Sequence, residues 1–331
     1  MARLPLTLIF SPNNRVRPLL EGAVQPDGID LTVSTASPAE IFWRQLHFAE
    51  FDVSEMSISS LLVVTARGDS PWVALPIFST RRFFHTQVLV RADAGIERPE
   101  DLKGKRMGVP EYQQTGALWV RAALQHEFGV APSDMAWYME RTVERSHGGA
   151  TGFQAPPGVQ FEYIPPEKDI ASMMLAGELD GNAFPITEAN MTNRSDVDAW
   201  RNPRIRPLFR DPEAEGVRYF EKTGIFPMNH TVVVRRSVLE QHPWAALNLF
   251  NAFQKSKESV LARARDLADP YFRVGYLPLA ARGGFDRDPF PYGVQANRPV
   301  LEKLTQFSHE QGLTPRVVKL EELFAPSTLE L

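Results

Sequence analysis

The chain has 331 residues, of which 43% are hydrophobic, so it can bury a sizeable core but is long for a single one, and two domains are expected. Its formal net charge of −4 does not favour nucleic acid or another polyanion as a partner. Cysteine is absent, which excludes disulfides, thiolate metal sites and cysteine nucleophiles, and no run of 18 or more apolar residues predicts a membrane span.

The first third of the chain alternates strand-like and helix-like segments. The apolar run at residues 6–10 is expected to be a strand. It is too short for a signal-peptide core and no small-residue cleavage site follows it, so we expect a cytoplasmic protein. Ser37-Pro38-Ala39-Glu40 favours a helix start, with a capping residue, a proline and an acidic first turn. With the apolar runs at 29–33, 51–53 and 73–77, this alternation predicts a parallel sheet with helices on both faces.

The segment 104–116 is a strand–loop–helix junction in the middle of the chain. A short apolar strand stops at Pro110, and helical apolar spacing begins at Leu118. Such a junction directs unpaired backbone N–H groups and the positive end of a helix dipole at one point, which suits a carboxylate or phosphate. Gln113, Gln114 and Thr115 add neutral donors. An ordinary turn capped by Thr115 is the structural alternative.

The rest of the chain continues this alternation and ends mainly in helices. Glycine and proline are frequent from 147 to 158, so a loop is expected there, and helices are expected over 237–268 and 297–310.

Two β-rich runs, at 85–90 and 230–234, flank a middle block that has its own strand and helix alternation. A domain inserted into another gives this arrangement, with the two runs as crossover strands. The predicted first lobe is therefore discontinuous and contains residues 1–91 and 225–331. The predicted second lobe contains residues 92–224.

Three short motifs occur together, namely Ser54-Glu55-Met56-Ser57, Pro110-Glu111-Tyr112-Gln113 and Pro291-Tyr292-Gly293. With them, the chain resembles the 4,5-dihydroxyphthalate decarboxylase family, whose fold is similar to that of the type II periplasmic binding proteins. The resemblance covers nearly all of the chain, whereas residues 99–105, Pro-Glu-Asp-Leu-Lys-Gly-Lys, are common to many binding-protein folds. It implies an α/β clamshell of two lobes, each a mostly parallel sheet flanked by helices, with the ligand between them.

The resemblance also implies a cofactor-free, non-oxidative loss of CO2 from a small aromatic carboxylate that bears a para hydroxyl, such as 4,5-dihydroxyphthalate, which would give protocatechuate. Loss of CO2 alone would leave a very basic aryl anion, so the ring carbon must be protonated first or in step. The reaction then needs cations for the carboxylates, an acceptor for the hydroxyl proton and an acid beside the ring carbon. No metal is expected, because no histidine or carboxylate cluster has metal-ligand spacing.

Arginines near the expected cleft are the candidates for holding carboxylates, because a guanidinium binds a carboxylate bidentately. They are Arg15, Arg81 and Arg82. Arg15 can equally be a solvated charge at a helix start. One of Arg81 and Arg82 is expected in a surface or hinge ion pair, because neighbours on a strand face opposite ways.

His230, His85 and Glu111 are the candidates for proton transfer, and the two histidines belong to the two crossover runs. Each has a structural alternative: a histidine in a strand is often only a structural residue, and Glu111 can simply favour the positive end of the helix that follows. Glu55 is a candidate both for these transfers and for binding. The remaining substrate-binding candidates are Ser57, Gln113, Thr115 and Tyr292. His147 is left undecided.

One segment departs from the family pattern. Residues 179–188 carry no arginine, where family members continue toward an Arg-Pro element. If that arginine grips one substrate carboxylate, its loss suits a substrate with one carboxylate fewer or with a different ring pattern. The reaction type is therefore predicted more firmly than the substrate.

A protein that only binds an aromatic acid is the competing hypothesis, because the same clamshell serves binding proteins and enzymes. The lack of a leader argues against an exported receptor. A biosynthetic enzyme of a related clamshell type is a third hypothesis, but it does not account for the motifs at 54–57 and 291–293 together. The oligomeric state is left open, a homo-oligomer included.

Overall fold

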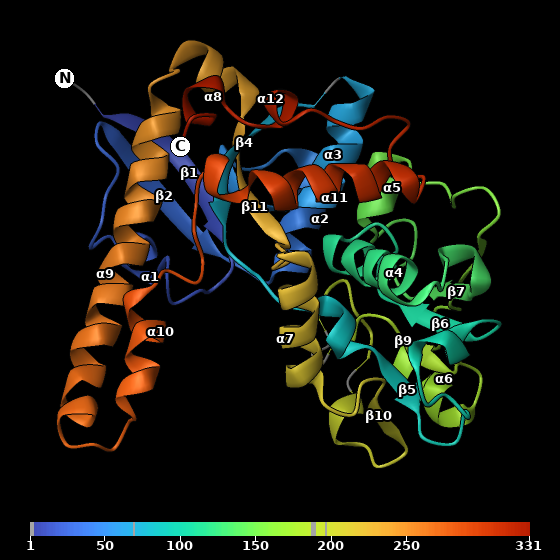
Figure 1. Cartoon of the computed structure of the whole chain (residues 1–331). Helices are drawn as coiled ribbons and strands as arrows, with labels where there is room; N and C mark the ends of the chain where they lie inside the picture. The colour runs from blue at the N-terminus through green and yellow to red at the C-terminus, as the bar shows by residue number, and fades with distance from the viewer. Residues whose placement is uncertain (1–2, 69, 187–189, 196) are drawn as a thin grey trace.

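The computed structural model describes residues 3–68, 70–186, 190–195 and 197–331. Within them the chain forms two α/β lobes, each built on one sheet, as Figure 1 shows. Among the described residues no helix is both long and apolar enough to cross a membrane.

The first lobe is built on a five-stranded sheet in the order β2-β1-β3-β11-β4. The strands are β1 (Leu4–Phe10), β2 (Ile29–Thr35), β3 (Val53–Ser57), β4 (Trp72–Phe78) and β11 (His230–Arg235). β1 runs parallel to β2 and β3, and β11 lies antiparallel between β3 and β4. The strand that returns from the second lobe is thus inserted into the interior of this sheet, between β3 and β4.

The second lobe is built on a six-stranded sheet in the order β10-β5-β9-β6-β7-β8. The strands are β5 (Leu89–Arg91), β6 (Arg106–Val109), β7 (Ala136–Met139), β8 (Gln160–Tyr163), β9 (Gly181–Asn182) and β10 (Ile205–Pro207). Strands β6 to β9 are parallel, while β5 and β10 are antiparallel to their neighbours. Both sheets are therefore mixed, because the chain enters, leaves and returns on antiparallel strands.

Helices cover both sheets. They are α1 (Arg17–Leu20), α2 (Pro38–Phe48), α3 (Ile58–Arg67), α4 (Thr115–Phe128), α5 (His147–Thr151), α6 (Ile170–Ala176), α7 (Pro212–Thr223), α8 (Arg236–Gln241), α9 (Ala245–Arg273), α10 (Arg282–Asp286), α11 (Arg298–Glu310) and α12 (Leu320–Leu323).

Two helix predictions need correction. The helix expected over 237–268 is divided into α8 and α9, with Pro243 at the break, where proline offers no backbone N–H for helical hydrogen bonding. The loop expected from 147 to 158 begins with the short helix α5, whose start is capped because the Gly149 N–H donates to Ser146 Oγ at 3.1 Å.

The two segments that connect the lobes run side by side. The Arg82 N–H donates to the Pro227 carbonyl at 3.2 Å, and the Asn229 N–H donates to the Thr80 carbonyl at 2.9 Å. An isolated antiparallel bridge pairs Arg81 with Met228. This pairing places Arg82 and the start of β11 next to each other between the lobes. The exact lobe boundaries stay a prediction, and β5 already pairs within the second sheet from Leu89.

The lobes share part of their apolar core. One cluster of buried side chains contains Met56 of the first lobe together with Val109 and Trp119 of the second. Helix α11 lies against α4, where Arg121 Nε donates to Gln311 Oε1 at 2.8 Å. Trp119 Nε1 also donates to the Met228 carbonyl in a connecting segment at 2.8 Å. The lobes are therefore held together by packing as well as by the two connections.

We expect Val233→Ala to destabilise the fold by about 2–3 kcal/mol, because Val233 is fully buried in β11 and the substitution removes two methyl groups and leaves a cavity. The matched control is Val217→Ala on α7, where the side chain is 56% exposed and a change within about 0.5 kcal/mol is expected. Chemical denaturation of both variants measures this. Equal effects would contradict the central position of β11.

Candidate active site

A cavity of about 300 Å³ lies between the two lobes. The first lobe contributes Ser37, Phe42, Ser57, Thr80, Arg82 and His230 to its lining, and the second lobe contributes Gln114, Thr115, Arg141, His147, Phe184 and Asn193. This volume is at the lower end of the range for small-molecule sites. We call it the interlobe cavity.

The lining of the interlobe cavity favours an anion. Three helices of ten or more residues begin at its wall: Ser37 precedes α2, Ser57 precedes α3 and Gln114 precedes α4. Their dipoles direct partial positive charge toward the cavity. Arg82 and Arg141 add two guanidinium groups, and no aspartate or glutamate is among the lining residues that the structure describes. A carboxylate is therefore well suited to this cavity.

His230 lines the cavity and is held from behind by Glu55. Glu55 is fully buried on β3, and its Oε1 lies 2.9 Å from His230 Nδ1. The hydroxyls of Ser11 and Ser79 donate to the two carboxylate oxygens, each at 2.5 Å. Burial opposes ionisation of Glu55, but His230 and the two hydroxyls outweigh it and lower the pKa of this carboxyl below its usual range. Glu55 is therefore an ionised partner for the imidazole.

The Glu55 carboxylate fixes the orientation of the His230 ring. An ionised carboxylate can only accept, so Nδ1 carries a proton and donates it to Glu55. In the neutral ring Nε2 is then the acceptor, and Asn229 Nδ2 lies 2.7 Å from it. A carboxylate that orients an imidazole in this way assigns proton exchange to the other ring nitrogen, here Nε2 beside the Asn229 amide. The pair can therefore act as an acid or a base toward a ligand.

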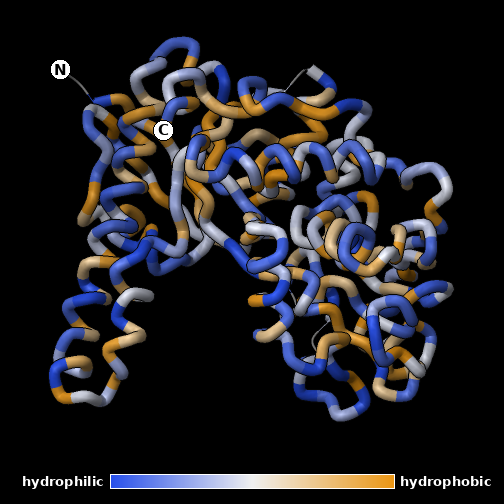
Figure 2. The backbone as a smooth tube through the Cα atoms, in the orientation of Figure 1, coloured by the Kyte–Doolittle hydropathy of each residue, from blue (hydrophilic) through white to orange (hydrophobic). Residues whose placement is uncertain are grey.

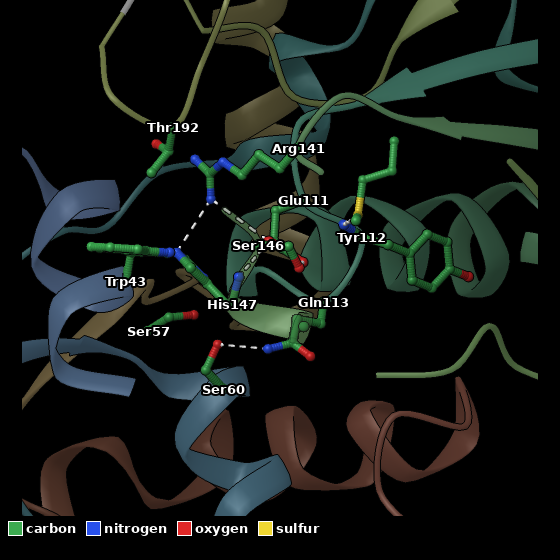
Figure 3. A network of polar contacts seen from close by, with 12 residues as sticks. Trp43, Ser57, Ser60, Glu111, Tyr112, Gln113, Arg141, Ser146, His147 and Thr192 are labelled. Carbon is green, nitrogen blue, oxygen red and sulfur yellow. Dashed lines mark hydrogen bonds and ion pairs between the residues drawn. The ribbon is translucent and has the colours of Figure 1, made fainter. Parts of the chain in front are cut away.

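A second polar network surrounds Arg141 on the opposite wall (Figure 3). Arg141 is buried, and its Nε and Nη2 donate to Asn193 Oδ1 at 3.0 and 2.9 Å, while Nη1 donates to His147 Nε2 at 3.2 Å. Burial lowers the pKa of Arg141, and Glu111, with 3.9 Å between Arg141 Nη1 and Oε2, opposes this shift. The guanidinium is thereby fixed in position at the cavity.

Aromatic rings form the apolar part of the cavity. Phe42 makes edge contacts with both His230 and His147, at ring-centroid distances of 4.8 and 5.4 Å. Phe84 and Phe184 stack at 5.9 Å. Gly116 permits this close packing, because a Cβ there would lie 2.2 Å from the Phe184 ring. Such walls suit a flat apolar ring, so the cavity combines aromatic and anionic binding features.

The structure brings several of the predicted residues together. Arg82, His230, Ser57 and Thr115 line the interlobe cavity, and Glu55 supports His230 directly. The sequence therefore located one wall of the cavity, the one formed by the connecting segments and the starts of α3 and α4.

Two predicted residues lie just behind the cavity. Glu111 is fully buried, accepts from the His147 N–H at 2.9 Å and has its pKa raised by burial. Gln113 is also buried, where its side chain donates to Ser60 and accepts from Thr151. Both residues support α5 and α3 (Figure 3), and neither is among the residues that line the cavity.

His85 lies elsewhere. It sits in the 3-10 turn Phe84–Gln87, not in a strand, and its Nε2 is 3.1 Å from Glu215 Oε1. Burial opposes ionisation of Glu215, but Arg218 and His85 outweigh it and lower the pKa of Glu215 to about 2. The structure thus gives His85 a partly buried partner on α7.

Arg15, Arg81 and Tyr292 are also placed outside the cavity lining. Arg15 stacks on the Phe290 ring, with 3.9 Å from its Cζ to the centroid, and donates to the Ser79 carbonyl. Arg81 is buried and donates to the backbone carbonyls of Phe226 and Pro291, so it supports the connecting segment.

Tyr292 is buried, with the Lys257 ammonium 3.9 Å from its ring centroid. Lys257 itself pairs with Asp288 at 2.5 Å.

Sequence reasoning missed Arg141 and Asn193 and left His147 undecided. Arg141 offers no local signal, because its burial comes from contacts with residues 30 or more positions away, Glu111 and Asn193. His147 does carry a signal, since Ser146 before it is a helix-capping residue. The segment 179–188 that lacks arginine includes Thr187 and Glu188, which lie outside the described residues. Arg141 nevertheless supplies a guanidinium from the same lobe.

Among the described residues, no group of three or more His, Asp or Glu side chains gathers in a metal-binding arrangement.

Comparison with known proteins gives a consistent result for the fold. Residues 15–151 match the family described as the periplasmic substrate-binding protein of a phosphonate ABC transporter. The aliphatic sulphonate binding protein SsuA from Escherichia coli aligns over 100% of both chains with a TM-score of 0.54 and 12% identity. The desulfurization enzyme DSZB aligns over 99% of this chain and 98% of its own, with a TM-score of 0.54 and 17% identity.

Relatives found by sequence similarity identify the family and not only the fold. A 4,5-dihydroxyphthalate decarboxylase of Comamonas testosteroni is 35% identical over 333 residues, which cover 100% of this chain and 99% of that protein. A 4,5-dihydroxyphthalate decarboxylase of Pseudomonas putida is 38% identical over 213 residues, covering 64% of this chain and 80% of that protein.

Fold and cavity together define a two-lobed α/β protein of the periplasmic-binding-protein fold, with a cavity between the lobes that suits an aromatic anion. Within this class, the chain belongs to the 4,5-dihydroxyphthalate decarboxylase family.

Replacement of Glu55 by glutamine tests the charge of this carboxylate. Because folding lowers the pKa of Glu55, its ionised form stabilises the native state above about pH 4.3, the usual pKa of glutamate, and this stabilisation is lost as the pH falls further. We therefore expect the difference in Tm between wild type and Glu55→Gln to be largest near neutral pH and to shrink as the pH falls below that value.

Thermal unfolding at a series of pH values measures this difference. The exposed Glu240→Gln on α8 is the control and should show a small difference throughout. A difference for Glu55→Gln that stays constant across the series would show that the carboxylate is not ionised in the folded protein.

Proposed function

We propose that this protein is a carboxy-lyase that removes CO2 without oxidation from a hydroxylated aromatic acid, either 4,5-dihydroxyphthalate or a close analogue. The observation that carries the proposal is the His230–Glu55 pair, a proton-exchanging group that opens into a cavity lined by cations and aromatic rings. The full-length similarity to a 4,5-dihydroxyphthalate decarboxylase supports the same reaction.

Arg82 and Arg141 are the groups that hold the carboxylates. They line the same cavity, one from the connecting segment and one from the second lobe. The Arg82 side chain forms no hydrogen bond or ion pair with any described residue. Its guanidinium can therefore bind a ligand in the cavity. Two cations on opposite lobes suit a substrate with two carboxylates, since each can be neutralised where it is bound.

His230 is the group that supplies the proton. The ionised para oxygen of the ring feeds electron density to the carbon that bears the carboxylate, and that carbon takes a proton from His230 Nε2. The C–C bond then breaks, its electron pair returns to the ring, and CO2 leaves. One proton is consumed in each turnover, and Glu55 stabilises the imidazolium that must form to donate it.

A protein that only binds an aromatic acid is the alternative, and the fold is compatible with it. Binding alone would use the cations and the aromatic walls. It would give no role to a buried glutamate that orients a histidine into the cavity. The decarboxylase therefore accounts for more of the site.

We expect His230→Ala to lower kcat for 4,5-dihydroxyphthalate by roughly 10²–10⁴, the contribution of a positioned acid or base. Arg82→Ala should mainly raise KM, with a smaller effect on kcat, if it binds the carboxylate equally in the ground and transition states. The assay is CO2 release without added cofactor and in excess chelator, with His242→Ala, at the end of α8, as the control variant.

Wild-type kcat in His230→Ala would reject the role of His230. Loss of turnover on chelation, restored by one divalent ion, would reject the cofactor-free reaction. An absence of CO2 release by the wild type across hydroxylated phthalates and benzoates would favour the binding protein.

We also propose that the chain forms a homo-oligomer through its projecting arm, residues 258–286 of α9 and α10. The arm extends away from both sheets (Figure 1), and Figure 2 shows apolar and polar stretches alternating along it. Six of the sixteen large apolar side chains that are exposed in the described residues lie within 267–285. They are Leu267, Tyr271, Val274, Tyr276, Leu279 and Phe285.

A second copy of the chain suits this surface better than a partner whose surface charges are all of one sign. The arm carries Arg265 and Asp266, neither of which takes part in an ion pair with any described residue, so opposite charges can meet when two arms pack together. A large aromatic side chain buries roughly 150–250 Å² when fully covered, so the three rings and three aliphatic side chains together are on the order of the roughly 800 Å² per partner of a stable interface.

Charged residues at the centre of this apolar surface should dissociate the oligomer, because an unpaired carboxylate is costly to bury. We expect the double variant Val274→Asp and Tyr276→Asp to be monomeric where the wild type is not, as measured by light scattering after size exclusion. Phe220→Asp on α7, an exposed apolar residue outside the arm, is the control. A monomeric wild type, or an unchanged mass of the double variant, would contradict the proposal.

A further inference from the structure

Three buried polar atoms of the interlobe cavity form no hydrogen bond with the described part of the chain. They are Ser37 Oγ, Gln114 Nε2 and His147 Nδ1. Each belongs to a residue that lines the cavity, and each residue stands at the start of a different helix, α2, α4 or α5. Buried polar atoms normally have partners, so three exceptions in one cavity point to a ligand.

Ser37 departs from the role that the sequence predicts for it. It occupies the N-cap position of α2, yet its hydroxyl accepts no hydrogen bond from the helix backbone. Gln114 occupies the corresponding position before α4 and likewise makes no capping bond. Both side chains are therefore free to turn to the cavity that they line, and capping does not explain them.

His147 is a neutral donor. Its Nε2 must accept, because the Arg141 guanidinium beside it can only donate, so the ring proton is on Nδ1. Burial, together with the positive charge of Arg141, lowers the pKa of His147 well below its usual range. Nδ1 lies toward the Ala39 carbonyl without forming a hydrogen bond of normal geometry. An imidazole N–H is thus present at the cavity throughout the neutral pH range.

These three groups differ from the arginines in carrying no charge. A carboxylate is better held by Arg82 and Arg141, whereas a hydroxyl or phenolate oxygen suits neutral donors. Ser37 and Gln114 can in addition accept from a hydroxyl through their oxygens. Phe42 contacts the rings of both His147 and His230, so one apolar side chain joins the His147 donor to the proton-exchanging pair.

We propose that Ser37, Gln114 and His147 form a subsite for the ring hydroxyl groups, which selects hydroxylated aromatic acids over unhydroxylated ones. This inference rests on the proposed function, which supplies the aromatic acid. Donors to the oxygen favour its ionised form, and the ionised oxygen supplies the electron density that protonation of the ring carbon requires. The subsite therefore determines specificity and also prepares the substrate for reaction.

Direct binding measurements test the subsite independently of turnover. Isothermal titration calorimetry with 3,4-dihydroxybenzoate and with benzoate gives a Kd ratio for each variant. The first probe is protocatechuate, the product expected from 4,5-dihydroxyphthalate, and the second carries no hydroxyl. We expect the wild type to prefer the dihydroxy acid by tenfold or more. Ser37→Ala and Gln114→Leu should each reduce this preference by about 3- to 10-fold, the usual value of one hydrogen bond, with little change for benzoate.

His147→Phe should do the same, but it also removes a partner of Arg141, so Ser37→Ala is the decisive variant if His147→Phe does not fold. The matched control is Thr65→Val, which alters another buried hydroxyl without a described partner, on α3 and outside the cavity lining. It should leave the ratio unchanged.

Three results would overturn the subsite: a wild type without preference, failure of both acids to bind, or equal weakening of both acids in Ser37→Ala and Gln114→Leu. A retained preference together with no CO2 release from any hydroxylated acid would instead reject the proposed reaction and leave the subsite intact. The two proposals can therefore fail separately.

Discussion

The buried carboxylate of Glu55 is the constraint on which the site and much of the first sheet depend. A fully buried charge is costly unless it is paired and hydrogen-bonded. Its partners come from the ends of β1 and β4, at Ser11 and Ser79, and from the start of β11, at His230. Only a returning strand inserted between β3 and β4 brings these groups to one point, so sheet order and proton chemistry are coupled.

Around this pair the fold forms an anion site mainly from helix starts, and few specialised side chains are needed. Three helix starts and two arginines face the cavity, and the carboxylates that support it, Glu55 and Glu111, lie behind the wall. Glu55 pairs with His230 and Glu111 lies 3.9 Å from Arg141, so neither carboxyl group faces the ligand. The cavity thus attracts an anion while the histidine that protonates it is held by a carboxylate from behind, an arrangement that binding alone does not require.

The features that could be predicted from the sequence are those that depend on the local pattern of apolar and turn residues. The junction at 104–116, the strand that holds Glu55 and the return at His230 follow from apolar spacing and turn residues, and they define one wall of the cavity. The opposite wall is built by Arg141 and Asn193, which meet only in the folded chain. His85 was misplaced for a related reason: a 3-10 turn replaces the expected strand there and directs the ring to Glu215 on α7.

The shared core limits how freely the lobes can move apart. Trp119 of α4 donates to the carbonyl of Met228 in a connecting segment, and α11 of the first lobe packs on α4 of the second. A clamshell held in this way keeps His230 and Arg82 on one side and Arg141 and His147 on the other near a fixed separation. Catalysis benefits from such a fixed geometry, because groups already in position need no reorganisation as charge moves from the carboxylate to the ring. A carrier that must open widely to deliver its cargo would gain nothing from it.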